Sequence, residues 1–366
     1  MKPYIAPEYE HNLLKNTYKP LGSTKLEVVI DKFLWNPVAT MLPRWLHPNV
    51  LTLIAFLFSV LGAFFPTFLF NYDGKSVSPR CIYLISAISI FLYQLLDALD
   101  GKQARNLKIA SSAGQLFDHG CDAITTFYML YTALSASQFG FSSNCVFIIT
   151  AITYHLFICS WYEYEFEKFK TNIASTVGIT EAQLLLVLLN LICFARPGIF
   201  AFCLVDIMPK ILANVLNFPP FNINLTTMVF YIVFAYVYYL SGTDLLNILS
   251  TSKFKNPKES ASIFVTLFIH LFCQFHYFWN GTIERHMFGV TFIVAIFGAN
   301  ICWRFMLASV AKSKPMLIDA HTVFFYLVGI ILALPLRNNI WETIIITRCV
   351  FIPLFTCLVS FMLTLR

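Results

Sequence analysis

Apolar and polar residues are arranged along this chain in long blocks. Some ten apolar blocks come close to the roughly 20 residues that a helix needs to cross a bilayer. Polar and charged residues gather between them. The predicted spans are residues 50–72, 81–100, 114–137, 142–162, 181–195, 225–249, 260–280, 287–310, 319–336 and 340–365. The pattern predicts an all-α, polytopic integral membrane protein with about ten transmembrane helices.

Two apolar segments do not fit a simple crossing. Between residues 26 and 46, apolar side chains alternate with Pro, Trp and cationic residues, which is typical of an amphipathic helix lying in the membrane interface. A soluble tail fits residues 1–25 better. Asp206, Pro209 and Lys210 interrupt residues 198–217, which we expect to be re-entrant or interfacial.

Composition supports a membrane protein and excludes several other classes. The chain is 58% hydrophobic and 12% charged, far from the composition of soluble domains. Its net charge of +6 comes without a basic, aromatic-rich run, so we expect no nucleic-acid partner. The ten Cys lie mostly in apolar blocks without paired spacing, which favours reduced thiols over disulfides or zinc. We expect no cleavable signal before the first span, which would itself serve as the signal.

Charge asymmetry sets the expected orientation. With the N-terminus in the cytosol, most of the 25 Lys and Arg fall in cytosolic segments, as the positive-inside rule requires. This orientation puts the loop around residues 101–113 on the cytosolic side.

Four carboxylates flank that loop, at the ends of two apolar blocks. Asp97 and Asp100 are three residues apart and Asp118 and Asp122 four apart, so each pair shares one face of a helix. Carboxylates at membrane depth are costly without a partner. Two opposed faces could surround hard divalent cations, and four carboxylates are enough for two ions. The alternative is that each Asp caps a helix or solvates a tight turn.

Arg105 and two glycines accompany the carboxylates. An arginine can hold phosphate oxygens in a bidentate way, and Gly101 and Gly114 leave room for a close ligand or backbone. The stretch therefore predicts a phosphate and metal site at a membrane surface.

The same stretch resembles the motif of the CDP-alcohol phosphotransferase family at every fixed position. Its local sequence, Asp-Gly-Lys-Gln-Ala-Arg and Phe-Asp-His-Gly-Cys-Asp, is similar to that of the eukaryotic choline/ethanolamine phosphotransferase branch. The matching positions are Asp97, Asp100, Gly101, Ala104, Arg105, Gly114, Asp118 and Asp122.

The resemblance implies an enzyme and its substrates. It implies transfer of phosphocholine or phosphoethanolamine from CDP-choline or CDP-ethanolamine to diacylglycerol, giving phosphatidylcholine or phosphatidylethanolamine and CMP. It also implies two Mg²⁺ or Mn²⁺ ions, a homodimer, and an endoplasmic reticulum or Golgi membrane with the site facing the cytosol.

The resemblance also implies roles for individual residues. His119 would be the general base, with Asp122 the next candidate, and the four Asp would hold the metal. Asn49, in a Pro-Asn-x-Leu-Thr stretch, would lie beside the nucleotide. The expected substrate-binding residues are Asn49, Gly101, Ala104, Arg105, Gly114 and Gln115.

Gln115 is a departure, because the branch has Glu there. It could still orient His119 by a hydrogen bond from one turn away, but it cannot raise the basicity of the imidazole as a carboxylate would. The stretch 160–164 and Thr180-Glu181 resemble the branch loosely; aromatic rings and carboxylates could hold a quaternary ammonium, although an aromatic belt at the interface explains these residues slightly better.

Two alternative functions and a division of the chain complete the predictions. Another enzyme of the family could use a different acceptor, although Asp118-His119-Gly argues against it. A divalent-cation transporter would use the acidic cluster as a pathway, but Arg105 disfavours cation passage. We expect a cytosolic tail and interfacial segment at 1–48, catalytic helices at 49–195, and further membrane helices for lipid access and oligomer contacts at 196–366.

Overall fold

The structure is a computed structural model that describes most of the first two thirds of the chain. The described residues are 9, 11–12, 23–71, 74, 76–139, 144–168, 172–174, 177–201, 225–251, 263–268, 271–272 and 298–315. These residues are almost entirely helical. The exception is a short antiparallel hairpin of β1 (Asn172–Ala174) and β2 (Val177–Gly178) between two helices. The helical class is therefore confirmed for the described part of the chain.

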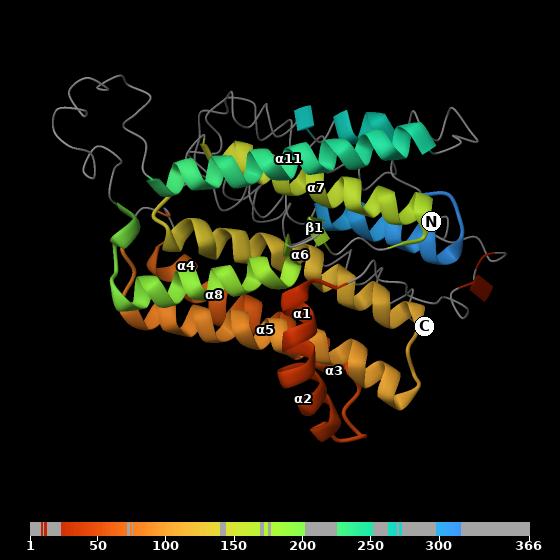
Figure 1. Cartoon of the computed structure of the whole chain (residues 1–366), viewed down its shortest axis with the longest axis horizontal. Coiled ribbons are helices and arrows are strands. Elements are labelled where there is room, and N and C mark those ends of the chain that lie inside the picture. The colour runs from red at the N-terminus through yellow and green to blue at the C-terminus, as the bar shows by residue number, and fades with distance from the viewer. Residues whose placement is uncertain are drawn as a thin grey trace, which may run out of the picture.

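A continuous helical run at the N-terminal side crosses the bundle instead of joining it. It consists of α1 (Lys25–Ile30), the wider turn η2 (Asp31–Trp35) and α2 (Asn36–Met41), and Figure 1 shows it running across the direction of the long helices. Several of its apolar side chains are exposed, with Phe33 71% and Met41 81% exposed. A helix with this direction and these exposed apolar residues suits the plane of a membrane surface.

Reciprocal hydrogen bonds join the start of this run to the start of α8 (Ile179–Ala195). Thr24 caps α1 together with Glu27, and its hydroxyl also donates to Glu181. In return, Thr180 Oγ1 donates to Glu27 Oε1 over 2.8 Å. Since each glutamate caps its own helix and accepts from the other, the two N-termini are fixed side by side.

The first span begins with α3 (Pro48–Leu57). His47 caps this helix, because its Nδ1 accepts a hydrogen bond from the backbone N–H of Asn49. The helix continues through the wider stretch η3 (Phe58–Phe64) into α4 (Phe65–Phe70). A Cβ on Gly62 would lie 2.0 Å from Ser89 Oγ of the next helix. Glycine is therefore required for the close approach of these two helices.

The next two helices carry the acidic motif. They are α5 (Arg80–Leu107) and α6 (Ser112–Ala136), joined by a short turn in which Lys108 adopts a left-handed conformation and Ser111 caps α6. The 28 residues of α5 extend about 42 Å at ~1.5 Å per residue, against ~30 Å of hydrocarbon. The helix is therefore longer than the hydrocarbon is thick, and its polar C-terminal turns carry the motif.

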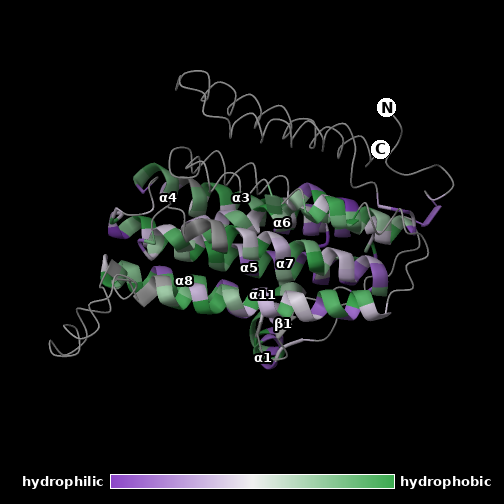
Figure 2. Cartoon of the chain, turned by 90° about the horizontal axis from the view of Figure 1, so that it is seen from above, coloured by the Kyte–Doolittle hydropathy of each residue, from purple (hydrophilic) through white to green (hydrophobic). Residues whose placement is uncertain are grey.

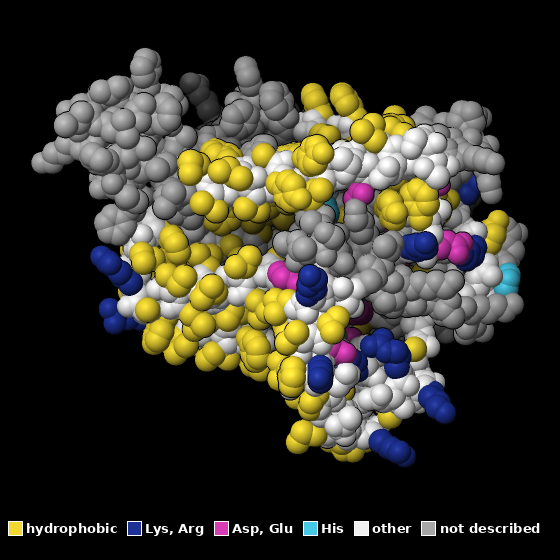
Figure 3. Space-filling model, viewed as in Figure 1, with side chains coloured by type: hydrophobic (Ala, Val, Ile, Leu, Met, Phe, Trp, Pro, Cys, Tyr) yellow, Lys and Arg dark blue, Asp and Glu magenta, His cyan; other side chains and the backbone are white. Residues whose placement is uncertain are grey.

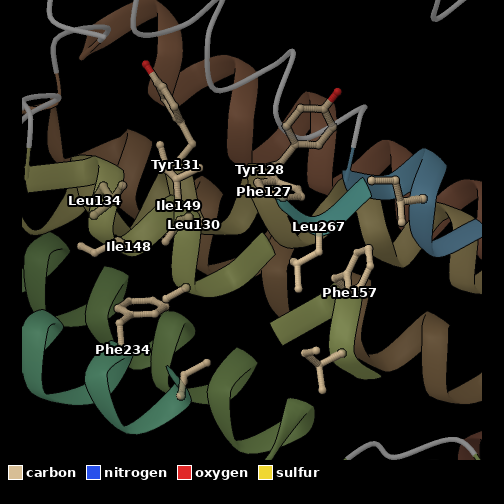
Figure 4. Close-up of a cluster of buried hydrophobic side chains, with 14 of the residues drawn as sticks. Phe127, Tyr128, Leu130, Tyr131, Leu134, Ile148, Ile149, Phe157, Phe234 and Leu267 are labelled. Carbon is tan, nitrogen blue, oxygen red and sulfur yellow. The ribbon is translucent and has the colours of Figure 1, made fainter. Parts of the chain in front are cut away.

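The remaining helices complete the bundle around an apolar core. α5 packs against α3 and α8, and α7 (Asn144–Phe166) packs against α11 (Leu225–Thr251). A short turn, η4 (Ile199–Ala201), follows α8, and a further helix covers residues 298–311. Figure 4 shows Phe127 of α6, Phe157 of α7 and Phe234 of α11 in this core.

The described residues contain three helices that are long and apolar enough to cross a membrane: Pro48–Phe70, Arg80–Leu107 and Met228–Thr251. Green, hydrophobic residues dominate much of these helices in Figure 2. Figure 3 shows hydrophobic side chains over α5 and α8, with charged residues gathered around α1, α2 and the nearby end of α5.

The predicted count of about ten spans is not confirmed. The predicted spans 319–336 and 340–365 lie outside the described residues, and 260–280 and 287–310 are described only in part. The same holds for 198–217, of which only the first four residues are described.

Candidate functional site

Three of the four motif carboxylates converge where the last turns of α5 meet the first turns of α6. Asp97, Asp100 and Asp118 each present an oxygen, and these three oxygens lie within 4.8 Å of one another. Asp122, one turn further along α6, lies beside Asp97. Two helices thus bring four acidic side chains to one small region, with each pair on one face of its helix as its spacing predicts.

Two neutral hydroxyl groups orient this cluster. Thr52 of α3 donates to Asp100 Oδ2, and Tyr93 of α5 donates to Asp122 Oδ1. Tyr93 is buried one turn before Asp97. Sequence reasoning missed both residues as parts of the site. Thr52 closes the Pro-Asn-x-Leu-Thr stretch, which was the available signal, but nothing in the sequence pairs Tyr93 with Asp122.

The donor set fits hard divalent cations. Asp118 Oδ1 is buried and has no hydrogen-bond partner in the described part of the chain. None of the four carboxylates forms an ion pair there with Lys or Arg, the described ion pairs including Lys102–Asp31 and Lys312–Glu167. A buried carboxylate oxygen without a donor is strongly unfavourable unless a cation or proton joins it. Oxygen-only ligands of this kind suit Mg²⁺ or Mn²⁺.

Arg105 lies next to the cluster on the exposed side of α5. A Cβ on Gly101 would lie 3.3 Å from Arg105 Nη1, so the guanidinium lies over the bare backbone of Gly101. Arg105 also acts on Asp100 electrostatically. Ala104, partly exposed beside Arg105, has only a methyl side chain, so little side-chain bulk covers this surface of the helix. The guanidinium is thus beside the carboxylates and open to an incoming anion.

Asn49 meets the start of α6. Its Oδ1 lies 3.5 Å from the position that a Cβ on Gly114 would take, and Ser111 Oγ lies 3.4 Å from the same position. The backbone N–H of Gly114 donates to Ser111 Oγ. The structure thus brings the expected residues Asn49 and Gly114 together, although they are far apart in the sequence.

Two motif residues without a predicted role hold the scaffold. Lys102 pairs with Asp31 and donates to Asn36 Oδ1 over 2.8 Å, which joins α5 to the crossing helical run. Gln103 Nε2 donates to the carbonyls of Pro43 and Leu46, at 3.0 and 3.1 Å. These bonds set the loop that leads into α3, and so position Asn49 and Thr52.

His119 lies on a different face of α6 from the carboxylates. It is 7% exposed, and its Nδ1 lies 3.2 Å from Met306 Sδ of the 298–311 helix. Leu116 and Ala123, on the same stripe of α6, pack against that helix too. The structure therefore does not include His119 in the carboxylate cluster, but holds it on the adjoining face.

Gln115 contacts a residue that the motif does not contain. Its Nε2 donates to Glu163 Oε1 of α7 over 3.3 Å, and Glu163 is 5% exposed. The loosely matching stretch 160–164 thus contributes to this region through its carboxylate. Its Trp161 is instead fully buried, with its ring edge-on to Phe157 and Phe264.

Comparison with known proteins extends these observations. Residues 45–242, more than half of the chain, match the CDP-alcohol phosphatidyltransferase family. The chain is similar over 98% of its length, at 27% identity, to a Dictyostelium discoideum protein called uncharacterized CDP-alcohol phosphatidyltransferase class-I family protein 1, of which the match covers 90%.

Two vertebrate proteins are similar over about half of the chain. Cholinephosphotransferase 1 of Gallus gallus is 30% identical over 51% of this chain, and that of Homo sapiens is 32% identical over 48%. The chain spans 55% and 42% of their respective lengths in these matches. All the motif residues described above lie within the family match, and the chain belongs to the CDP-alcohol phosphatidyltransferase family.

Proposed function

We propose that this membrane protein transfers phosphocholine or phosphoethanolamine from the corresponding CDP-alcohol to diacylglycerol, giving phosphatidylcholine or phosphatidylethanolamine and CMP. The family match and the similarity to cholinephosphotransferases support a CDP-alcohol as donor. The observation that carries the proposal is the carboxylate cluster in which Asp118 Oδ1 lacks a partner in the described part of the chain, beside an exposed arginine.

Asp97, Asp100, Asp118 and Asp122 would hold two Mg²⁺ or Mn²⁺ ions. Metal ions held there would supply positive charge to neutralise the pyrophosphate and the departing CMP. Thr52 and Tyr93 fix the rotamers of Asp100 and Asp122 through their hydroxyl groups, and so set the direction of the carboxylate oxygens.

Arg105 would grip the phosphate that bears the alcohol. Its planar fork matches phosphate oxygens, and Gly101 and Ala104 leave the space beside it clear. Asn49, Gly114 and Gln115 would bind the remainder of the CDP-alcohol, with the small Gly114 allowing close approach to the start of α6. Transfer then depends on positioning more than on a covalent intermediate.

His119 would accept the proton of the diacylglycerol hydroxyl as it attacks. In the tautomer with the proton on Nδ1, directed at the weak acceptor Met306 Sδ, Nε2 would be the basic nitrogen. The hydroxyl must then approach α6 from the side of His119 while the phosphate lies on the side of the carboxylates. Asp122 is the alternative base, because it lies one turn further along the same helix.

The membrane setting suits this pair of substrates. A water-soluble CDP-alcohol would arrive from the cytosol at the end of α5, and the lipid would arrive laterally between helices. We extend the proposal to residues 49–195 as catalytic helices, residues 1–48 as the cytosolic and interfacial segment, and residues 196–366 as helices for lipid access. A homodimer in the endoplasmic reticulum or Golgi membrane is part of the same proposal.

A substrate panel tests the proposed function. Purified full-length protein in nanodiscs receives Mg²⁺, diacylglycerol and either CDP-choline or CDP-ethanolamine, and CMP and phospholipid are quantified by mass spectrometry. Equal amounts of CMP and the matching phospholipid are expected. Product formed only with another acceptor would show that diacylglycerol is not the lipid acceptor. Mg²⁺ flux in sealed vesicles without CMP release would favour a transporter.

A further inference from the structure

One buried carboxylate near the site has no role in the mechanism above. Glu163, in the last turn of α7, is 5% exposed, and its Oε1 accepts from Gln115. Its other oxygen, Oε2, is buried without a hydrogen-bond partner in the described part of the chain. A buried acceptor left in this way costs stability, and much more so if it is charged.

Glu163 lies at the same end of the bundle as the carboxylate cluster. Gln115, its hydrogen-bond partner, is three residues before Asp118 and four before His119 on α6. Residues at these spacings are neighbours on a helix, with about 5–6 Å between their Cβ atoms. Through Gln115, Glu163 is therefore linked to the part of α6 that carries Asp118 and His119.

The surroundings of Glu163 offer no compensating charge among the described residues. Its neighbour Cys302 lies on the 298–311 helix, where its thiol contacts Ser160. In the described part of the chain Glu163 has no ion pair, whereas Glu167, one turn later, pairs with Lys312 at the surface. Glu163 thus has an acceptor oxygen that a cationic hydrogen-bond donor would satisfy.

We propose that Glu163 is the specificity-determining acceptor for the cationic nitrogen of the transferred amino alcohol, and that it favours a primary ammonium over a quaternary one. The inference rests on the proposed function, since it places that nitrogen beside a phosphate at the carboxylate cluster. It also assigns a role to Gln115, which holds Glu163 Oε1 and leaves Oε2 for the ligand.

The preference follows from hydrogen-bonding capacity. A primary ammonium has N–H donors for Oε2, whereas a quaternary ammonium has none and is recognised best by aromatic faces. Trp161, the large aromatic residue two positions before Glu163, is fully buried and packs on Phe157 and Phe264. Trp161 therefore offers no open ring face to a quaternary ammonium, whereas Glu163 Oε2 offers an acceptor to a primary one.

Equilibrium binding to the full-length protein tests this role. Three donors are titrated in the presence of Mg²⁺: CDP-ethanolamine, CDP-choline and CDP-propanol, in which a methyl group replaces the ammonium. In the wild type, CDP-ethanolamine should bind on the order of 10- to 100-fold more tightly than CDP-propanol, which is the range for a hydrogen bond to a charged group. In Glu163→Gln that difference should shrink to less than about threefold, while CDP-propanol binds as in the wild type.

Two further variants control the experiment. Glu167→Gln removes a surface carboxylate close to Glu163 in the sequence and should keep the wild-type preference. The exchange Gln115→Glu with Glu163→Gln keeps the amide–carboxylate pair between α6 and α7 but moves the charge to α6, and it should restore part of the preference for CDP-ethanolamine.

The outcomes separate this inference from the proposed function. Equal loss of affinity for all three donors in Glu163→Gln and in the exchange variant would show a packing role and overturn the inference. The inference also fails if the wild type binds CDP-choline as tightly as CDP-ethanolamine, or if Glu163→Gln keeps the preference. If the wild type binds none of the three donors, the proposed function itself fails.

Discussion

The two occupied faces of α6 differ in what they contain. The face toward α5 presents Asp118, which lies beside Asp97 and Asp100, and Asp122, which accepts from the hydroxyl of Tyr93. Thr52 donates a second neutral hydroxyl to Asp100 of this cluster. The face toward α7 and the 298–311 helix presents Gln115 and His119, which meet Glu163 and Met306. One face is a cluster of negative oxygens, and the other is a more enclosed set of mixed polar groups.

This difference suggests a division of labour across one helix. Oxygens alone suit a metal-bound pyrophosphate, and a buried imidazole and a single carboxylate suit a proton and an organic cation. The two faces adjoin along α6, so a phosphate held at the carboxylates and a hydroxyl beside His119 would meet where the two faces adjoin. Variants on either face should therefore fail in different kinetic parameters.

The largest effect is expected on the face toward α5. Asp118→Asn removes the charge of the carboxylate whose Oδ1 is unpartnered among the described residues. Turnover should fall by roughly 10³-fold, the upper end of the range for loss of one preorganised electrostatic group. CMP release at saturating Mg²⁺ measures it. Asp31→Asn, on the crossing helical run, is the matched control and should retain most of its activity.

The next effect is expected on the adjoining face, toward α7 and the 298–311 helix. His119→Ala should slow the chemical step by on the order of 10²–10⁴-fold and leave CDP-alcohol binding nearly unchanged. The wild-type rate should fall at acid pH as the imidazole is protonated, and that acid limb should be absent from the mutant. Single-turnover rates across pH measure both. Normal turnover in His119→Ala would move the role of base to Asp122.

A moderate effect is expected from the hydroxyl that orients Asp122. Tyr93→Phe should raise the Mg²⁺ concentration for half-maximal activity by about 10- to 100-fold, the usual loss when a partner of a metal ligand is removed. Excess Mg²⁺ should restore most of the rate. Tyr83→Phe removes a hydroxyl that accepts from Ser78 N at the other end of α5 and should leave the Mg²⁺ dependence unchanged.

The smallest effect is expected at the exposed edge of the cluster. Arg105→Lys keeps the charge but loses the planar fork, so KM for the CDP-alcohol should rise by about tenfold, corresponding to one charge-assisted hydrogen bond. The kcat should change less. Arg44→Lys changes an exposed arginine of the loop before α3 and serves as control. An unchanged KM in Arg105→Lys would show that Arg105 does not bind the phosphate and only anchors the helix at the membrane surface.

The spacing of the Asp residues predicted the two acidic helix faces, because the face that a residue occupies depends only on its position along its own helix. Asp97 and Asp100, like Asp118 and Asp122, share a helix face wherever the segment is helical, and both segments are. Hydropathy did not give the end of α5, which continues to Leu107 and not only to residue 100. Polar residues end a membrane crossing, but they do not end a helix.

The contacts across the fold could not be read in this way. Thr52 and Asp100 are 48 residues apart, as are Gln115 and Glu163, and Tyr93 and Asp122 are 29 apart. Such pairs depend on how the helices pack, which no local pattern specifies. The same packing turns His119 toward Met306, whereas sequence adjacency alone would have left it beside Asp118.

The metal dependence of the complete reaction tests the central claim most directly. Purified wild-type protein is treated with EDTA, given CDP-ethanolamine and diacylglycerol, and then titrated with Mg²⁺ while CMP and phosphatidylethanolamine are measured together. The account predicts no product before the addition of Mg²⁺ and equal amounts of both products afterwards, with neither formed by Asp118→Asn. Full turnover in EDTA, or in Asp118→Asn, would contradict it.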